Sequence, residues 1–526
     1  MEKGYLSLIL HAHLPFIREP QHEDFLEERW FFEAMTDTYI PLLIAFEKLI
    51  EEGVPFNITM DISPSLSAML ADELLLDKFA RHLDKMVELC DKEIERTTFS
   101  PEFNGLARMY HHKFAHSRYL FNDRWHRDII GAFRAVKEKG FLEIITCGAT
   151  HGFLPLLNVH DSSVRAQIKT GVESFRHHFH DNPKGIWLPE CAYYEGVEDY
   201  LKAEGINYFL METHGVLFCR PRPKYGVYSS YFTRNGVGVF ARDAESSKNV
   251  WSSKEGYPGD YNYREYYRDI GFDLDHEYIK PYIAATGARV FTGIKYFKIT
   301  GPGDHKQPYD PVTAESTAAN HAANFMFNRE KQIEHLSSLF DRQPIVVSPY
   351  DAELFGHWWY EGVDFLYYLL KKIHFDQNIF KTITPGGYLS KHPGNQVIRP
   401  APSSWGHKGY AEVWLNGDND WIYPHLHKAA EVMTNLARNA RPDNNVKKRL
   451  LDQMTRELLL AQSSDWPFII TMGTFVEFAA KRVTGHLENF YTLYHQYINS
   501  TPDVYTLEAF ERKNNIFPNI DYTVFS

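Results

Sequence analysis

The sequence predicts an α/β fold in which a parallel sheet closes into a (β/α) barrel, followed by an α-helical C-terminal domain. Three observations support this prediction. Short apolar segments of strand character alternate with amphipathic helical segments, which is the pattern of parallel strands joined by helices. A polar residue follows every strand, and in a barrel such residues meet at one end. After about residue 395 helical periodicity replaces this alternation. An open doubly wound sheet is the alternative arrangement.

Seven segments have the short, apolar, β-branched character of buried parallel strands. They occupy residues 5–10, 56–60, 142–147, 185–189, 208–211, 237–240 and 345–347. The polar residues at or just beyond their ends are His11, Asp61, His151, Glu190, Glu212, Asp243 and Asp351. Apolar residues recur at helical spacing between the strands, so we expect helices over 65–80, 163–179 and 314–340.

The barrel is expected to span residues 1–395, with an inserted loop region at about 195–275. Tyr225 and Trp251 lie in turn-rich stretches of that region, and long loops commonly serve as lids or binding loops. We therefore expect Tyr225 to close over a cleft, with a solvated surface turn as the alternative. A helical domain at 396–526 is expected to complete the cleft, with helices near 425–440, 446–462 and 472–499.

Composition and charge restrict the partners of the chain. The 526 residues carry a formal net charge of -12, and the pI is near 6.1. A net-acidic surface repels nucleic acid and anionic membranes, so neither is an expected partner. Aromatic residues make up 15% of the chain, enough to line an extended cleft for a neutral substrate. No Gly-rich nucleotide motif follows any strand, and we expect no cofactor.

Cysteine and histidine usage predicts a cytoplasmic protein without a metal. The four cysteines lie far apart, with neither disulfide nor zinc-site spacing, which is typical of a reducing compartment. The N-terminal apolar run is too short for a signal peptide, and no stretch reaches the length of a membrane span. Among 26 histidines, the groups at 111–116 and 177–180 have no accompanying metal motif, so no metal is expected.

Two strand ends carry a carboxylate next to aromatic residues. Glu190 precedes two tyrosines, and Asp351 precedes Trp358. Paired acids suit glycosyl transfer, in which one carboxylate attacks the sugar while the other acid protonates the leaving oxygen. For Asp351 the alternative role is a helix N-cap. His11 and His13 follow the first strand. They either make hydrogen bonds within a packed barrel mouth, or they hold sugar hydroxyls or orient a carboxylate, and we favour this functional role.

A set of ordered motifs spans nearly the whole chain. They read HAHLPF at 11–16, ATHGFLPLL at 149–157, WLPECAY at 187–193, SPYDAELFGHWWYEG at 348–362, SSWG and VWLN within 403–416, and SSDWPF at 463–468. In order and spacing they resemble glycoside hydrolase family 57. Within that family they are most similar to the 1,4-α-glucan branching enzyme group, some members of which carry an α-amylase label.

The resemblance implies a seven-stranded (β/α) barrel with a small inserted region, a helical C-terminal domain and a retaining mechanism without a metal. Glu190 matches the family nucleophile, and Asp351 matches its general acid/base. An α-glucan such as amylose, glycogen or starch is the implied substrate. Residues that match substrate-cleft positions, or lie near them, are His11, His151, Trp251, Trp405, Trp414 and Asp465.

The sequence departs from the wider family in two places, at His11-Ala12-His13 and at residues 148–151. Both departures are shared by the branching-enzyme group and narrow the assignment to it. A third feature departs from that group: after Glu190 the chain runs almost directly into a helix at 196–204 and leaves little room for the long loop of branching enzymes. Hydrolysis of α-1,4 linkages is therefore the alternative to branching. A non-catalytic glucan-binding protein is a further alternative, against which the paired acids argue.

Overall fold

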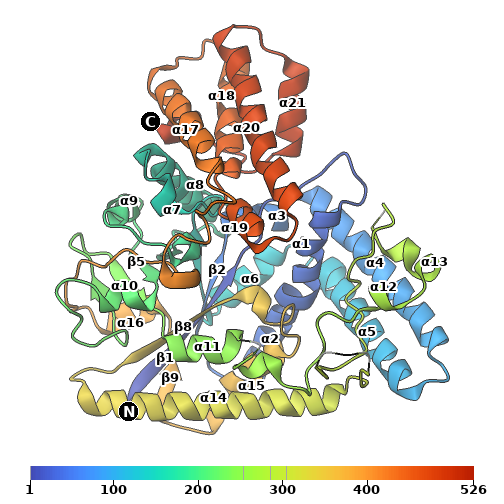
Figure 1. Ribbon diagram of the computed structural model, residues 1–526. Coiled ribbons are helices and arrows are strands. Elements are labelled where there is room, and N and C mark those ends of the chain that lie inside the picture. The colour runs from blue at the N-terminus through green and yellow to red at the C-terminus, as the bar shows by residue number, and fades with distance from the viewer. Residues whose placement is uncertain (1, 253, 285, 302, 304) are drawn as a thin grey trace.

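The computed structural model describes residues 2–252, 254–284, 286–301, 303 and 305–526. Its centre is a curled sheet of parallel strands in the order β7-β5-β4-β3-β2-β1-β8 (Figure 1). All seven predicted strands are confirmed. They are β1 (Gly4–Ala12), β2 (Ile58–Ile62), β3 (Leu142–Cys147), β4 (Gly185–Trp187), β5 (Tyr208–Met211), β7 (Gly238–Ala241) and β8 (Ile345–Asp351). Two short strands extend the sheet, β6 (Tyr231–Phe232) antiparallel to β7 and β9 (Phe380–Thr382) parallel to β1.

The two ends of the curled sheet meet without a ladder among the described residues. The N–H of Asp243, just after β7, donates to the carbonyl of Val347 on β8 at 2.8 Å. The N–H of Ile345, at the start of β8, donates to the carbonyl of Tyr228 at 3.0 Å. The predicted barrel is therefore present in an incompletely closed form, joined at its seam by single hydrogen bonds.

Side-chain alternation along the strands decides which residues face the interior of the barrel. On β1, Leu10 packs in the main core against the surrounding helices, whereas Ile9 packs in a separate cluster inside the barrel. The same period of two turns His11 inward at the carboxyl end of the strand. The register places His11 beside Asp61 of β2 and Asp351 of β8. Polar residues from neighbouring strands thus converge at the barrel mouth.

Helices cover the outside of the sheet, and the longest, α14, runs along the lower edge of the molecule in Figure 1. The larger ones are α1 (Arg29–Ala34), α2 (Ile40–Glu51), α3 (Pro64–Leu70), α4 (Glu73–Arg96), α5 (Pro101–Tyr119), α6 (Ile129–Glu138), α8 (Asp161–Phe179), α14 (Pro311–Leu339) and α15 (Gly362–Phe375). Shorter ones are α7 (Leu154–Leu157), α9 (Val197–Ala203), α10 (Thr213–Leu217), α11 (Ala244–Trp251), α12 (Ile270–Asp273), α13 (His276–Ile279) and α16 (Pro385–Lys391).

Two of the three helices predicted within the barrel region are confirmed, at α8 and α14. The third, expected over 65–80, is divided between α3 and α4. The division falls at Asp72, whose carboxylate accepts a hydrogen bond from the N–H of Leu75 at 3.1 Å and caps the start of α4. An N-cap of this kind begins a new helix even where the apolar periodicity continues.

A segment at 252–310 connects α11 to α14, and its described residues are largely irregular. Its bounds differ from the predicted inserted region of 195–275, because β5 and β7 belong to the sheet. The buried carboxylate of Asp269 holds the segment together by accepting hydrogen bonds from the N–H groups of Gly271, Thr292 and Gly293 at 2.8 to 3.0 Å. Because polar hydrogen bonds rather than packed apolar side chains hold the segment, its sequence has no periodic pattern of apolar residues from which its bounds could be predicted.

The C-terminal helices form the upper part of the molecule in Figure 1. They are α17 (Ile422–Asn439), α18 (Asn445–Ala461), α19 (Asp465–Met472), α20 (Val476–Ile498) and α21 (Val504–Lys513). Polar contacts join this helical region to the barrel mouth. The N–H of Ser464 donates to the carbonyl of His151 at 3.0 Å, and Arg482 pairs with Glu19 at 3.0 Å. Among the described residues, no helix combines the length and the hydropathy that a membrane crossing requires.

Candidate active site

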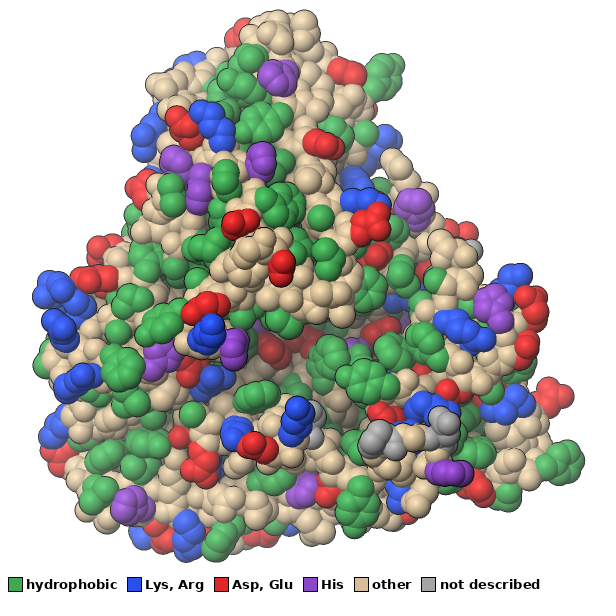
Figure 2. Space-filling model, in the orientation of Figure 1, with side chains coloured by type: hydrophobic (Ala, Val, Ile, Leu, Met, Phe, Trp, Pro, Cys, Tyr) green, Lys and Arg blue, Asp and Glu red, His purple; other side chains and the backbone are tan. Residues whose placement is uncertain are grey.

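A cleft of about 630 Å³ lies between the barrel mouth and the helical region. In Figure 2 it is the hollow near the centre of the molecule. A larger depression on the outer surface along α6, of about 730 Å³, contains none of the predicted site residues. Ten of the eleven predicted site residues line the central cleft: His11, His13, His151, Glu190, Trp251, Asp351, Trp358, Trp405, Trp414 and Asp465.

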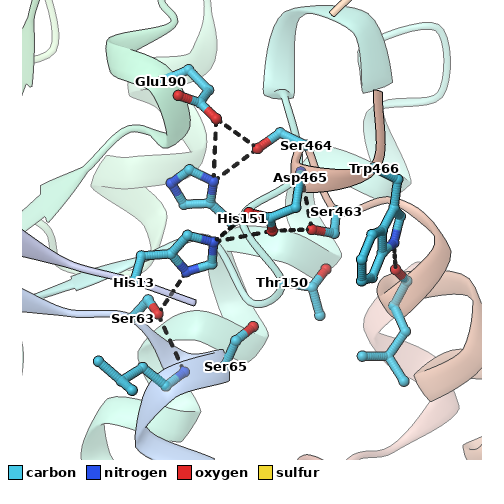
Figure 3. Close-up of polar contacts among 12 residues, drawn as sticks. His13, Ser63, Ser65, Thr150, His151, Glu190, Ser463, Ser464, Asp465 and Trp466 are labelled. Atoms are coloured by element: carbon cyan, nitrogen blue, oxygen red, sulfur yellow. Dashed lines mark hydrogen bonds and ion pairs between the residues drawn. The ribbon is translucent and has the colours of Figure 1, made fainter. Parts of the chain in front are cut away.

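Glu190 lies in the tight turn Pro189–Cys191 that follows β4. Its backbone is left-handed, with φ 62°, a conformation that costs a non-glycine residue about 1–3 kcal/mol and clusters at functional sites. One carboxylate oxygen accepts a hydrogen bond from the indole N–H of Trp405 at 2.8 Å. The other accepts one from the hydroxyl of Ser464 at 2.9 Å, which Figure 3 shows reaching across from the helical region.

Asp351 is the last residue of β8, and its neighbour in the β1 register is His11. Solvent reaches its side chain from the cleft, and the carboxyl group makes no hydrogen bond with a described residue. In particular it does not cap the short 3-10 turn Ala352–Leu354. The alternative role of Asp351 as an N-cap is therefore wrong.

Burial raises the pKa of both carboxyl groups. For Glu190 the pKa rises to about 7, because burial and the nearby charges of Asp465 and Asp351 outweigh its two hydrogen bonds. Protein surrounds Asp351 on the sides away from the cleft, and this burial raises its pKa to about 6 against the opposing charges of His13 and Arg242. The two pKa values do not by themselves separate a nucleophile from an acid. Hydrogen bonding distinguishes the two carboxyl groups, because among the described residues Glu190 has two donors that favour its anion and Asp351 has none.

Three histidine rings stack beside the two acids. The rings of His13 and His151 lie 3.9 Å apart, those of His11 and His151 lie 5.0 Å apart, and His11 lies flat against Trp187 at 4.6 Å. Burial, assisted by the charge of His13, lowers the pKa of His11 and of His151 well below the ordinary value, so both are neutral. Burial also opposes protonation of His13, but Asp465, 3.1 Å away, and further carboxylates raise its pKa. Of the three rings, His13 is therefore the one that most readily carries a proton.

His13, His151 and Asp465 bring potential ligand atoms within 4.8 Å of one another, the spacing of a metal site. Their nitrogens are already used. In His151, Nδ1 contacts Ser464 at 2.8 Å and Nε2 contacts His11 at 3.0 Å. In His13, Nε2 pairs with Asp465 and Nδ1 contacts a serine hydroxyl at 2.8 Å. Each imidazole nitrogen of the two histidines thus has a hydrogen-bonding partner, and a metal ion at this position would have to displace some of these contacts.

Comparison with known protein families shows to which family the chain belongs. The family model described as glycosyl hydrolase family 57 matches residues 7–400. The chain belongs to this family. A second model, described as the C-terminal part of 1,4-alpha-glucan branching enzymes, matches residues 425–525, which form the helical region.

Relatives of this family 57 protein include enzymes with two different names. A 1,4-alpha-glucan branching enzyme from Thermococcus kodakarensis is 32% identical over 550 aligned residues, which cover 98% of this chain and 77% of the relative. The solved structure of the alpha-amylase AmyC from Thermotoga maritima matches with a TM-score of 0.94 and 41% identity over 99% of both chains. A family 57 branching enzyme from Pyrococcus horikoshii matches with a TM-score of 0.89 and 32% identity, covering 99% of this chain and 97% of that one.

The four predicted tryptophans of this family 57 protein line the cleft in two ways. Trp405 is half-buried and Trp414 is 1% exposed, so packing fixes both rings. Trp251 and Trp358 are 57% and 56% exposed, and Trp358 stacks on Tyr266 with ring centroids 4.9 Å apart. The exposed pair offers free ring faces on which a sugar can pack.

The expected lid residue, Tyr225, does not line the cleft. Its ring packs against Phe340 with centroids 5.2 Å apart, and its hydroxyl donates to Asp341. Only 9% of the residue is exposed. The lid prediction is wrong because this tyrosine finds an apolar partner and a carboxylate acceptor beyond the end of α14, and both fix it there.

Three residues around the site were not predicted to take part in it. Ser464 donates to Glu190, and its signal was its position in the SSDWPF motif. Asp61 contacts His11 and ends a predicted strand. Glu353 accepts hydrogen bonds from Tyr39 and from the N–H of residue 13, and burial raises its pKa to about 8.

Proposed function

We propose that this protein forms α-1,6 branches on α-1,4-glucans such as amylose, glycogen or starch by a retaining glycosyl transfer. The observation that carries the proposal is the unequal bonding of two acids in one cleft: Glu190 has two hydrogen-bond donors, and Asp351 has none among the residues that the structure describes. The names of the relatives from Thermococcus kodakarensis and Pyrococcus horikoshii, and of the C-terminal family match, support branching as the reaction.

In the first step Glu190 is the nucleophile. Hydrogen bonds from Trp405 and Ser464 favour its anion, which attacks the anomeric carbon of an α-1,4 linkage. Asp351 gives its proton to the departing glycosidic oxygen, so this bond breaks as the ester bond to Glu190 forms. Retaining glycosidases place the two carboxyl groups about 5–5.5 Å apart.

In the second step a 6-hydroxyl group of another glucan attacks the glycosyl-enzyme. Asp351, now a carboxylate, takes the hydroxyl proton, and Glu190 leaves as a carboxylate. The new α-1,6 linkage retains the anomeric configuration. His13, when protonated, balances the negative charge of the cleft, while Trp251 and Trp358 supply exposed ring faces for the glucan chains.

Hydrolysis is the second candidate, in which water replaces the 6-hydroxyl. The alpha-amylase name of the Thermotoga maritima relative, at 41% identity, favours it. So does the short connection after the nucleophile, because only residues 191–196 separate Glu190 from α9. A segment of that length offers little cover to exclude water from the covalent intermediate.

Product analysis on amylose separates the candidates. We expect more chain ends released by a debranching enzyme than new reducing ends formed in the primary reaction. A large excess of reducing ends without branches would assign hydrolysis instead. Absence of both products from a folded protein that still binds amylose would leave the non-catalytic binding role. Glu190→Gln serves as the inactive control, and Glu138→Gln, an exposed acid on α6, serves as the matched neutral control.

We also propose a cytoplasmic location. All four cysteines are free and buried, which suits a reducing compartment. Fractionation of the source cells tests the proposal, and recovery of the protein in the extracellular fraction would contradict it.

A further inference from the structure

A line of hydrogen-bonding groups connects Glu190 to Asp61, a carboxyl on β2 that is 0% exposed. The Ser464 hydroxyl lies 2.9 Å from Oε1 of Glu190 and 2.8 Å from Nδ1 of His151 (Figure 3). Nε2 of His151 lies 3.0 Å from Nε2 of His11, and Nδ1 of His11 lies 2.5 Å from Oδ2 of Asp61. Strand register and the backbone bond between Ser464 and His151 fix these groups in place.

The contact between the two Nε2 atoms limits where hydrogens can lie. At 3.0 Å one Nε2 carries a hydrogen and the other does not. A neutral imidazole has one N–H, so the state of each Nε2 fixes the state of its Nδ1. His11 and His151 are both neutral and therefore opposite tautomers. Only two complete hydrogen-bonding patterns remain for the line.

In the first pattern protonated Asp61 donates to His11, His11 to His151, His151 to Ser464, and Ser464 to anionic Glu190. In the second pattern every hydrogen is displaced by one link: protonated Glu190 donates to Ser464, and the line ends with His11 donating to anionic Asp61. Both patterns contain four hydrogens. The proton that one carboxyl gains is the proton that the other loses.

We propose that Asp61 is a positioning residue that keeps Glu190 anionic by holding the proton at the far end of this line. The inference rests on the proposed nucleophilic role of Glu190, because only that role requires an anion there. The bonding of the two ends favours the first pattern. Oδ1 of Asp61 has no partner among the described residues, whereas Glu190 has a second donor in Trp405. A buried carboxylate with a single donor is the less stable of the two anions.

The surroundings of Asp61 support this direction. Burial, with a smaller effect from the charge of Glu353, raises the pKa of Asp61 well above its ordinary value. The neighbouring charges act on both ends of the line: those of Asp465 and Asp351 oppose an anion at Glu190, whereas His13 favours it, and the charge of Glu353 opposes an anion at Asp61. The titratable groups that face one or other carboxyl from the elements packed against them are His11, His13, Cys147, His151, Cys191, Asp351, Glu353 and Asp465.

Two substitutions of Asp61 separate a proton-holding role from a purely structural one. Asp61→Asn retains an N–H that can donate to Nδ1 of His11, which preserves the first pattern and blocks its reversal. Asp61→Ala removes that donor, so the hydrogen bonds of the line can change from the first pattern to the second when Glu190 takes a proton. Thr59→Val is the matched control, because Thr59 lies on the same face of β2 and its hydroxyl has no partner among the described residues.

The pH profile of kcat/KM on amylose is the readout. For Asp61→Ala we expect the acidic limb to move up by about one pH unit, a roughly tenfold loss of kcat/KM at a pH below the limb. Asp61→Asn and Thr59→Val are expected to retain the wild-type limb. An unchanged limb in Asp61→Ala, or an equal shift in Asp61→Asn, would overturn the proposal.

Neutron diffraction of the wild-type protein at a pH well above the raised pKa of Glu190, which is about 7, tests the same proposal without measuring activity and without a variant that must fold. We expect hydrogen on Oδ2 of Asp61, on Nε2 of His11 and on Nδ1 of His151, with none on Glu190. Hydrogen on Glu190 with a bare Asp61 would contradict it. A wild-type protein with the expected hydrogens but no action on α-glucans would refute the proposed function alone.

Discussion

Two carboxylates, the buried Glu457 in the helical region and the partly buried Glu190 in the cleft, are stabilised very differently. Glu457 accepts hydrogen bonds from His486 at 2.7 Å, from Gln453 at 2.8 Å and from Asn514 at 2.8 and 3.0 Å. Burial opposes its charge, yet these donors lower its pKa below the ordinary value. Glu190 has only two donors, and its pKa is raised to about 7.

The difference teaches that the number of donors, rather than burial, separates a structural anion from a reactive one. A carboxylate with all its lone pairs satisfied is held as an anion and resists both protonation and reaction. A carboxylate with fewer donors than it can accept titrates near neutral pH and remains available to a substrate. Substitution of the cleft carboxylate should therefore affect turnover, whereas substitution of the carboxylate in the helical region should affect stability.

The largest expected effect is on turnover by the cleft acids. Glu190→Gln and Asp351→Asn should each lower kcat on amylose by at least about a thousandfold, because one removes the nucleophile and the other the transferable proton. Circular dichroism and thermal unfolding should show a folded protein in both cases. Either folded variant with near wild-type turnover would remove that residue from the catalytic pair.

The same type of substitution in the helical region should act on stability instead. Glu457→Gln replaces an acceptor by an amide N–H₂ among donors, so we expect the free energy of unfolding to fall by about 3 kcal/mol. Turnover per folded molecule should stay within about twofold of wild type. Urea unfolding combined with activity measured at low temperature checks both statements. A stable but inactive variant would erase the distinction between the two regions.

The reactive pair should also set the pH dependence of kcat/KM. In the proposed mechanism Glu190 must be deprotonated to attack, and with its pKa raised to about 7 its deprotonated fraction falls as the pH drops below that value. Asp351 must be protonated, and with its pKa raised to about 6 its protonated fraction falls as the pH rises above that value, so the rate follows the product of the two fractions. We expect a narrow bell with its maximum between pH 6 and 7. A broad plateau extending beyond pH 8 would contradict these assignments.

A smaller effect is expected from the exposed rings of the cleft rim. Trp251→Ala should raise KM for long glucans roughly tenfold while kcat changes little, because the ring contacts substrate remote from the reacting bond. Phe99→Ala is the control, since Phe99 is 97% exposed and does not line the cleft. Equal changes in the two variants would show that Trp251 contributes nothing specific to binding.

The smallest effect should come from Tyr225. Tyr225→Phe removes the hydrogen bond to Asp341 and should lower the free energy of unfolding by about 1 kcal/mol. The ratio of branches to reducing ends on amylose should not change, because the ring lies against Phe340 and not in the cleft. A shift of that ratio towards reducing ends would restore the lid interpretation.

Local sequence patterns were sufficient for the seven strands and for placing both cleft acids. Each strand is a short apolar run that ends in a polar residue. The strands and the acids could therefore be predicted without knowledge of contacts between distant residues. The donors to Glu190 could not be found in this way. Trp405 and Ser464 follow it by 215 and 274 positions, and their contacts depend on how the helical region docks. The lid prediction for Tyr225 was wrong for the same reason, because the partners of this residue follow it by more than 100 positions.

The late position of those donors has a consequence during protein synthesis. The chain is made from its N-terminus, so all seven strands and both acids can leave the ribosome before Trp405 and Ser464 have been translated. A nascent barrel of this kind holds Glu190 without either hydrogen bond that favours its anion. If Glu190 is the nucleophile as proposed, we expect catalytic competence to arise only after the helical region has been made and has packed on the barrel.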